Sequence, residues 1–125
     1  MTGAHGVDSS PEELFQSSPD GLELYRAAHR LITTTVEATV RTTASQVAFR
    51  RRRGFAYVWN PRRHLSTDVP AVLSLALPRR VDSPRFKEIV HPSPTVWMHH
   101  LELRRADQLD AEVADWIREA HGAAE

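Results

Sequence analysis

Apolar residues recur with helical spacing near both ends of the chain and with strand spacing between them. Near the N-terminus, a helical stripe predicts an amphipathic helix that begins at Ser18-Pro19-Asp20 and ends at the β-branched run of residues 33–35. A capping box upstream, with Ser10 as its N-cap, predicts one additional short helical segment. The stripe occupies positions i, i+3, i+4 and i+7, which are Leu24, Ala27, Ala28 and Leu31.

A second helical stripe lies near the C-terminus. Asp107 is the predicted N-cap of this helix, and Gly122 follows its predicted end. Because an amphipathic helix must bury its apolar face on another layer, both helices are expected to pack on a sheet. The apolar members of this second stripe are Leu109, Val113, Trp116, Ile117 and Ala120.

Five segments between the helices have the residue pattern of β-strands. Residues 61–69 are expected to form a polar loop, and Ser83-Pro84 to begin another short helix that ends at His91-Pro92. The short connections favour antiparallel pairing. We therefore expect an α+β fold, with a mostly antiparallel sheet of about five strands and the N- and C-terminal helices packed on one face. The predicted strands cover residues 36–41, 45–50, 55–59, 71–77 and 96–103.

The sequence leaves open the register of the hairpin at residues 50–55. With an even-numbered loop, Arg50 pairs with Phe55, and Tyr57 and Trp59 then share the face of Arg50, opposite the core. With an odd-numbered loop, all three aromatic residues point into the core. Exposed aromatic rings would form a stacking surface of the kind by which sheet platforms bind single strands.

Composition is typical of a globular protein. A chain of 125 residues suits a single domain, expected over residues 10–125 after a disordered segment of residues 1–9. Disulfides, thiolate metal sites and cysteine nucleophiles are excluded because the chain has no cysteine. Neither a membrane-spanning apolar stretch nor a secretion signal is recognisable, so a cytoplasmic protein without membrane contact is expected.

The formal net charge of zero conceals a division of the chain into three charge blocks. Residues 1–40 carry six acids and two bases, residues 41–105 carry thirteen bases and four acids, and residues 106–125 carry six acids and one base. Fifteen of the sixteen bases are arginine, whose planar guanidinium group suits carboxylate and phosphate partners. A basic middle between two acidic ends predicts a dipolar molecule.

Four consecutive arginines at residues 50–53 form the most conspicuous candidate site. Guanidinium groups crowded into one hairpin repel one another, so they favour an anionic partner, such as nucleic acid or a phosphorylated ligand. The alternative is a solvated turn whose charge blocks unwanted strand pairing. The candidate ligand-binding residues are Arg50, Arg51, Arg52, Arg53, Tyr57, Trp59, Arg79, Arg80, His91 and His100.

Histidines and serines give no recognisable catalytic motif. On the strand at residues 96–103, His99 and His100 point to opposite sides, so they cannot bind one ion. A metal site built from His91, His100 and Glu102 is possible in principle, but the favoured interpretation of the histidines is structural. No HExxH, GxSxG or P-loop motif occurs, and we predict no catalytic residue, metal or cofactor.

Several segments resemble a family of uncharacterised actinobacterial proteins of the domain-of-unknown-function type. They are SQVAFRRRRGFA at residues 45–56, SPRFKE at 83–88, HPSP at 91–94 and WMHH at 97–100. The resemblance covers nearly the whole chain and brings no established activity. More remotely, the order of helix, sheet and helix is similar to that of the YdhG group, which has been called frataxin-like. That similarity implies iron binding by an acidic first helix, where this chain offers Glu12, Glu13, Asp20 and Glu23, interrupted by Arg26 and Arg30.

The function expected from the sequence is that of a non-enzymatic anion-binding module. Arg50, Arg52 and Arg53 would contact nucleic acid or a phosphorylated ligand, and Tyr57 or Trp59 would stack on it. A protein-interaction module that forms a homodimer through its acidic and basic sides is the alternative. A small enzyme with a pocket lined by residues 79, 91 and 99, or a frataxin-like metal binder, is the less favoured interpretation.

Overall fold

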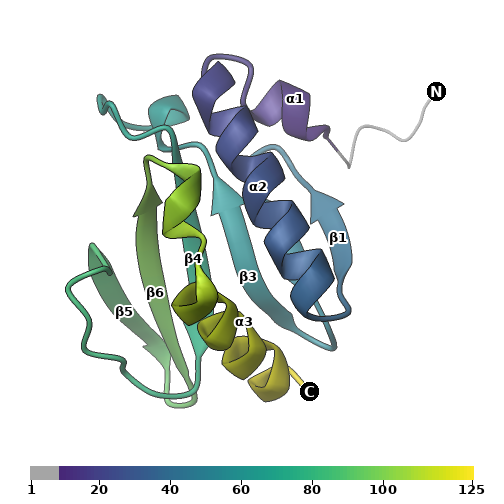
Figure 1. Cartoon of the computed structure of the whole chain (residues 1–125), viewed down its shortest axis with the longest axis vertical. Coiled ribbons are helices and arrows are strands. Elements are labelled where there is room, and N and C mark those ends of the chain that lie inside the picture. Colours follow the sequence, from purple (N-terminus) through teal and green to yellow (C-terminus); the bar gives the residue numbers. More distant parts are fainter. Residues whose placement is uncertain (1–8) are drawn as a thin grey trace.

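The computed structural model describes residues 9–125, which form a six-stranded sheet and three α-helices (Figure 1). All neighbouring strands are antiparallel, in the order β1-β2-β3-β4-β6-β5. The elements are α1 (Pro11–Leu14), α2 (Pro19–Thr35), β1 (Thr39–Thr42), β2 (Val47–Arg50), β3 (Gly54–Trp59), η1 (Pro61–Arg63), β4 (Ala71–Leu77), β5 (Glu88–Ser93), β6 (Val96–Leu103), η2 (Ala106–Gln108) and α3 (Ala111–Ala123).

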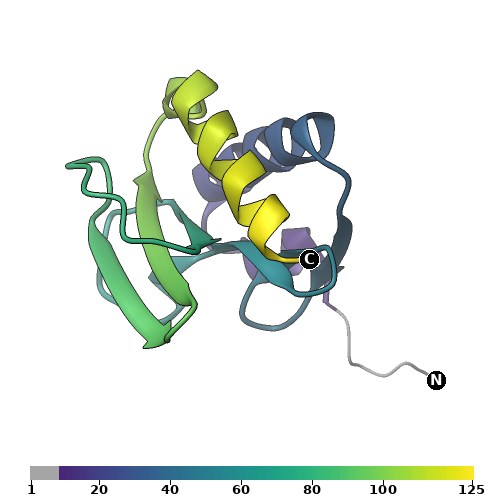
Figure 2. The ribbon, with the colours of Figure 1, turned by 90° about the horizontal axis from the view of Figure 1, so that it is seen from below.

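The expected α+β class is confirmed, with six strands in place of about five. Both long helices, α2 and α3, lie on the same face of the sheet (Figures 1 and 2). Among residues 9–125, no helix combines the length and apolar character needed to cross a bilayer. The expected disordered segment lies outside the described residues, apart from Ser9, which donates its N–H to the Thr42 carbonyl over 3.0 Å.

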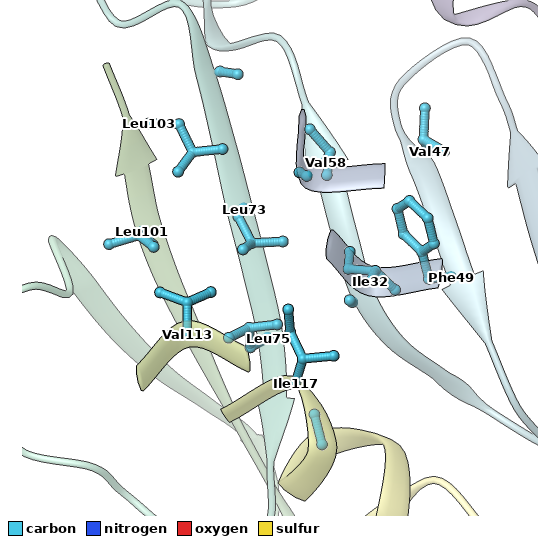
Figure 3. Packing of buried hydrophobic residues seen from close by; sticks show 14 of the residues in the cluster. Ile32, Val47, Phe49, Val58, Leu73, Leu75, Leu101, Leu103, Val113 and Ile117 are labelled. Atoms are coloured by element: carbon cyan, nitrogen blue, oxygen red, sulfur yellow. The ribbon is translucent and has the colours of Figure 1, made fainter. Parts of the chain in front are cut away.

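The core fills the space between the sheet and the two long helices (Figure 3). Ile32 from α2 and Ile117 from α3 are fully buried there, against alternate residues of the central strands such as Leu73 and Leu75. Because strand side chains alternate between faces, the intervening residues of β4 point to the opposite side. Neither α2 nor α3 covers that side, which we call the uncovered face.

The N-terminal helices begin as expected, but α2 ends later. The capping box at Ser10 is formed, with the Glu13 N–H donating to the serine hydroxyl over 3.1 Å. The prediction that α2 ends at the threonine run is wrong, since the helix continues through residue 35. Thr33 and Thr34 each donate a hydroxyl to the carbonyl four residues earlier, which makes both polar side chains compatible with the helix. As a consequence, β1 begins three residues later than predicted.

The start of the C-terminal helix also differs from the prediction. Asp107 lies in η2, and the N-cap of α3 is Asp110, whose carboxylate accepts the Val113 N–H over 3.2 Å. Gly122 lies inside α3, and the C-cap is Ala124. Both sites carry an aspartate before an apolar stripe, so the sequence pattern alone did not distinguish a 3₁₀ turn from the true helix start.

The prediction of a short helix that begins at Ser83-Pro84 is wrong. Residues 84–87 form a turn, and residues 88–93 form β5, the outermost strand beside β6. Phe86 anchors the turn by packing between the rings of His99 and Trp116, with centroid distances of 4.7 and 4.5 Å. Pro92 is tolerated in β5 because an edge strand needs backbone hydrogen bonds on one side only.

The hairpin between β2 and β3 contains a β-bulge. Arg50 pairs with Gly54, whereas Phe49 pairs with Ala56, so Phe55 is the extra residue. Phe55 is fully buried and contacts the His121 ring of α3 at 5.3 Å between centroids. Of the two registers considered above, the even-numbered one is therefore right for Tyr57 and Trp59, which lie on the uncovered face, and wrong for Phe55.

Candidate functional site: the uncovered face of the sheet

One row of directly paired residues crosses all six strands on the uncovered face. Ser74 lies at its centre, on β4, and is flanked by Tyr57 of β3 and His100 of β6. The row begins with a guanidinium group on one edge strand and ends with a carboxylate on the other. From β1 to β5 its members are Arg41, Ala48, Tyr57, Ser74, His100 and Glu88.

Two adjoining hollows lie on this face. The larger has a volume of ≈ 440 Å³, and the smaller, of ≈ 270 Å³, shares Trp59 and His100 with it. Pro61, Leu65, Val69 and Val72 make much of the smaller hollow apolar, with Lys87, Glu88 and Glu102 also on its lining. The larger hollow is lined by Ser45, Gln46, Tyr57, Trp59, His64, Ser74, Met98 and His100.

A chain of hydrogen bonds fixes the rings between the two hollows. The indole N–H of Trp59 donates to Ser74 Oγ over 2.9 Å, and Ser74 Oγ lies 2.6 Å from Nδ1 of His100. The Trp59 and His100 rings also meet edge-on, with 6.2 Å between centroids. Burial lowers the pKa of His100 from its ordinary value of 6.5, and the carboxylate of Glu88 opposes this shift. His100 is therefore neutral at pH 7.

The Ser74–His100 pair has the distance of a nucleophile and its base. Ser74 is only 3% exposed, and its oxygen already accepts the Trp59 N–H. The arrangement holds both rings in fixed orientations. Ser74 was not among the site residues predicted from the sequence, although it is the only polar residue of β4, because its position between Tyr57 and His100 depends on the pairing of β4 with β3 and β6.

The Tyr57 side chain reaches Gly54, at the hairpin end of the uncovered face. A Cβ atom at Gly54 would overlap its hydroxyl group, so glycine at this position leaves space for the ring. Gly54 is paired with Arg50, and the Tyr57 hydroxyl therefore lies at the same end of the face as the Arg50 side chain.

Two of the four hairpin arginines bind the C-terminus of α3. Arg53 donates to the carbonyls of Ala123 and Glu125 over 3.0 and 3.3 Å, and Arg51 donates to that of His121 over 3.3 Å. The backbone N–H groups of residues 52 and 53 both donate to the Ala124 carbonyl over 3.2 Å. These contacts supply donors to the carbonyl groups at the end of α3, of which that of His121 also accepts the Ala124 N–H, and they place positive charge at the negative end of the helix dipole.

Arg50 and Arg52 are the hairpin arginines left without such a role. Both are exposed, and among residues 9–125 neither has a carboxylate partner. The Arg50 side chain makes one weak contact, to the Arg52 carbonyl at 3.5 Å. Two of the four arginines of the predicted cluster, Arg50 and Arg52, are thus available to contact a ligand.

Within residues 9–125, six of the other eight arginines of the basic middle pair with carboxylates, four of them with acids of the two chain ends. Arg62 meets Asp20 at 2.8 Å, and its hydrogen bond holds the pKa of that carboxyl group below the usual value. Among the candidate residues, Arg79 pairs with Glu119 at 2.8 Å and Arg80 with the nearby Asp82 at 3.0 Å. The structure therefore does not bring these two arginines to the uncovered face.

The histidines lie apart from one another. His99 is fully buried on the helix side, where its Nδ1–H donates to the Trp97 carbonyl (2.8 Å) and its Nε2 accepts the Val81 N–H (2.9 Å). His91 stacks on Trp97, with 3.5 Å between ring centroids, so it lies on the opposite face from His100. Within the described part of the chain, no three histidine or acidic side chains are grouped as a metal site would require.

Comparison with known proteins identifies a family without an assigned activity. No curated protein and no solved structure matches the chain. The family model of a domain of unknown function, DUF5655, matches residues 12–124, and this supports the uncharacterised domain family expected from the sequence. The described fold and nearly all of the uncovered face lie within the matched residues, and the chain belongs to the DUF5655 family.

Proposed function

We propose that this domain is a binding module that holds a nucleotide unit, free or within a single strand, on the uncovered face of its sheet. The observation that carries the proposal is the row of paired residues that joins Tyr57, Ser74 and His100 beside Trp59 and the larger hollow. The half-buried rings of Trp59 and His100, which are fixed by hydrogen bonds, offer flat surfaces at little entropic cost.

The size and lining of the hollow support a planar polar ligand. Its volume of ≈ 440 Å³ falls within the range of small-molecule sites. The rings of Tyr57 and Trp59 line it together with the amide of Gln46 and the imidazole groups of His64 and His100. A nucleobase combines a stacking surface with hydrogen-bonding edges, and stacking on one aromatic side chain contributes about 1–3 kcal/mol per base.

The distribution of unpaired positive charge supports a phosphate group on the ligand. Arg50 lies at the hairpin end of the uncovered face, the same end as the Tyr57 hydroxyl. Arg63 precedes His64, which lines the larger hollow at the opposite end of the strands, and it has no carboxylate partner among residues 9–125. We assign phosphate contacts to these two arginines and to Arg52, while Arg51 and Arg53 keep their role at α3.

Fluorescence anisotropy of a labelled pyrimidine strand of about 12 nucleotides tests the proposal. We expect binding at about 50 mM salt that weakens steeply by about 200 mM, because phosphate contacts release counterions. Arg50→Gln should weaken binding, whereas Arg30→Gln should not. Arg30 is the matched control because it is an exposed arginine on α2, also without a carboxylate partner among the described residues.

Unlabelled uridine monophosphate, added as a competitor, distinguishes a site for a free nucleotide from a site that needs a strand. Displacement of the strand indicates that one nucleotide unit suffices, and failure to displace it indicates that several linked units are needed. The proposal is overturned if the strand does not bind at low salt, or if Arg30→Gln weakens binding as much as Arg50→Gln. A dimeric mass of the protein alone that reverts to the monomer in Tyr57→Glu would instead assign this face to self-association.

A further inference from the structure

We infer that His100 recognises the base of the bound nucleotide by donating a hydrogen bond from Nε2 to an acceptor on the ring. This inference rests on the proposed function and extends it from charge and stacking to the recognition of a base edge. It assigns direct contact with the ligand to His100 and positioning roles to Ser74 and Trp59.

Each hydrogen bond between Trp59, Ser74 and His100 has one direction. An indole N–H can only donate, so Ser74 Oγ accepts from Trp59. The single hydroxyl hydrogen of Ser74 then has one partner at short range, Nδ1 of His100 at 2.6 Å. If His100 donated from Nδ1 instead, the serine hydrogen would be left without an acceptor in a residue that is 3% exposed, which is costly. Nδ1 therefore accepts, and the imidazole hydrogen lies on Nε2.

The hydrogen on Nε2 of His100 is accessible to a ligand. Among residues 9–125, no partner of His100 Nε2 is found, and no buried side-chain nitrogen or oxygen lacks a hydrogen bond. Nε2 is therefore reached by solvent. Because His100 lines both hollows, this donor is available to a molecule that occupies either of them. A neutral, fixed donor on the lining of these hollows is suited to a neutral acceptor such as a base carbonyl.

The charged residues around His100 determine the orientation of the ligand. Glu88 is the direct cross-strand partner of His100, and Glu102 lies two residues along β6 on the same face. Both carboxylates line the smaller hollow beside His100 and repel a phosphate group there, with Lys87 as the one cation on that lining. The phosphate is therefore placed toward Arg50, on the other side of Tyr57, and the uncharged base edge meets His100.

Long-range ¹H–¹⁵N correlation spectra of the histidine side chains test the inference before any ligand is added. In the wild-type protein we expect the Nε2–H tautomer of His100, and in Ser74→Ala a mixture of tautomers. Ser17→Ala, at an exposed serine between α1 and α2, is the matched control and should leave the His100 signals unchanged. A wild-type His100 that carries its hydrogen on Nδ1 would overturn the inference, whether or not nucleotides bind.

The same samples are then titrated with uridine monophosphate and with ribose 5-phosphate, which lacks the base. We expect only the nucleotide to shift the His100 Nε2 signal, and its affinity to fall about three- to tenfold in Ser74→Ala, the value of one hydrogen bond. Equal affinity for the two compounds would refute base recognition while leaving phosphate binding intact. If neither the nucleotide nor the labelled strand binds, the proposed function itself fails.

Discussion

His99 and His100 are neighbours in sequence with opposite environments. His99 is sealed between the sheet and α3 with both ring nitrogens hydrogen-bonded, while His100 faces the two hollows. The strand alternation predicted from the sequence placed them correctly on opposite sides. Their hydrogen-bond partners were not predictable, because Val81 and Ser74 reach them only through the folding of the loop before β5 and the pairing of β4 with β6.

The environment of His99 predicts a loss of stability on mild acidification. Burial is the main cause that lowers the pKa of His99 below 6.5, and the charges of Arg80 and Arg79 act in the same direction. Between the folded pKa and 6.5, the unfolded chain binds more protons than the native state, so the free energy of unfolding decreases as the pH falls. His100, whose pKa is also lowered, adds to the effect.

Urea unfolding at a pH of about 7.5 and of about 5.5 measures this effect. The midpoint should be lower at the more acidic pH. Asp20, Asp107 and Asp110 have pKa values lowered from 3.8, so the stability they contribute is lost only at lower pH and does not interfere. An equal or higher midpoint at the acidic pH would contradict the role given to the buried imidazole.

At the scale of elements, strands were predictable where their residues are apolar and continuous. The bounds of β4 and β6 agree with the prediction, since long apolar or alternating runs specify burial on their own. β5 was missed because Pro92 and the preceding Ser83-Pro84 are local signals for the end and the start of a helix, whereas the pairing of β5 with β6 is a tertiary effect. The bulge at Phe55 likewise follows from contact with α3.

The arginine hairpin and the end of α3 form one structural unit, which predicts different effects of neighbouring substitutions. Arg53→Ala should lower the free energy of unfolding by about 0.3–1 kcal/mol, because two carbonyl contacts and a favourable charge at the helix end are lost. Arg52→Ala should have no measurable effect on stability, since the Arg52 side chain has no such contact and its backbone N–H bond remains.

Chemical unfolding of the two variants beside the wild type provides the measurement, and anisotropy with the labelled strand separates stability from binding. Arg52→Ala should weaken binding of the strand, in contrast to its neutral effect on unfolding. If Arg53→Ala left stability unchanged, or if both variants behaved alike in both assays, the division of the hairpin into structural and ligand-facing arginines would be wrong.

At the scale of the whole molecule, the three charge blocks of the sequence are largely used to join the parts of the fold. Arg85 shows this most clearly, since it contacts Asp110 at 3.1 Å and Glu112 at 2.8 Å at the start of α3. These bonds hold the turn before β5 on the helix, and they raise the pKa of Arg85 itself. The charge division was read correctly from the sequence, but which arginines would remain free for a partner depended on the fold.

The most direct test of binding on the uncovered face uses the indole N–H signals of the three tryptophans during titration with uridine monophosphate. Trp59 lies on the uncovered face, whereas Trp97 stacks on His91 at the sheet edge and Trp116 is a buried residue of α3 that packs on Phe86. A ligand in the larger hollow shifts the Trp59 signal and leaves those of Trp97 and Trp116 in place. Shifts of Trp97 or Trp116 with an unmoved Trp59 would contradict the assignment of the binding site to this face.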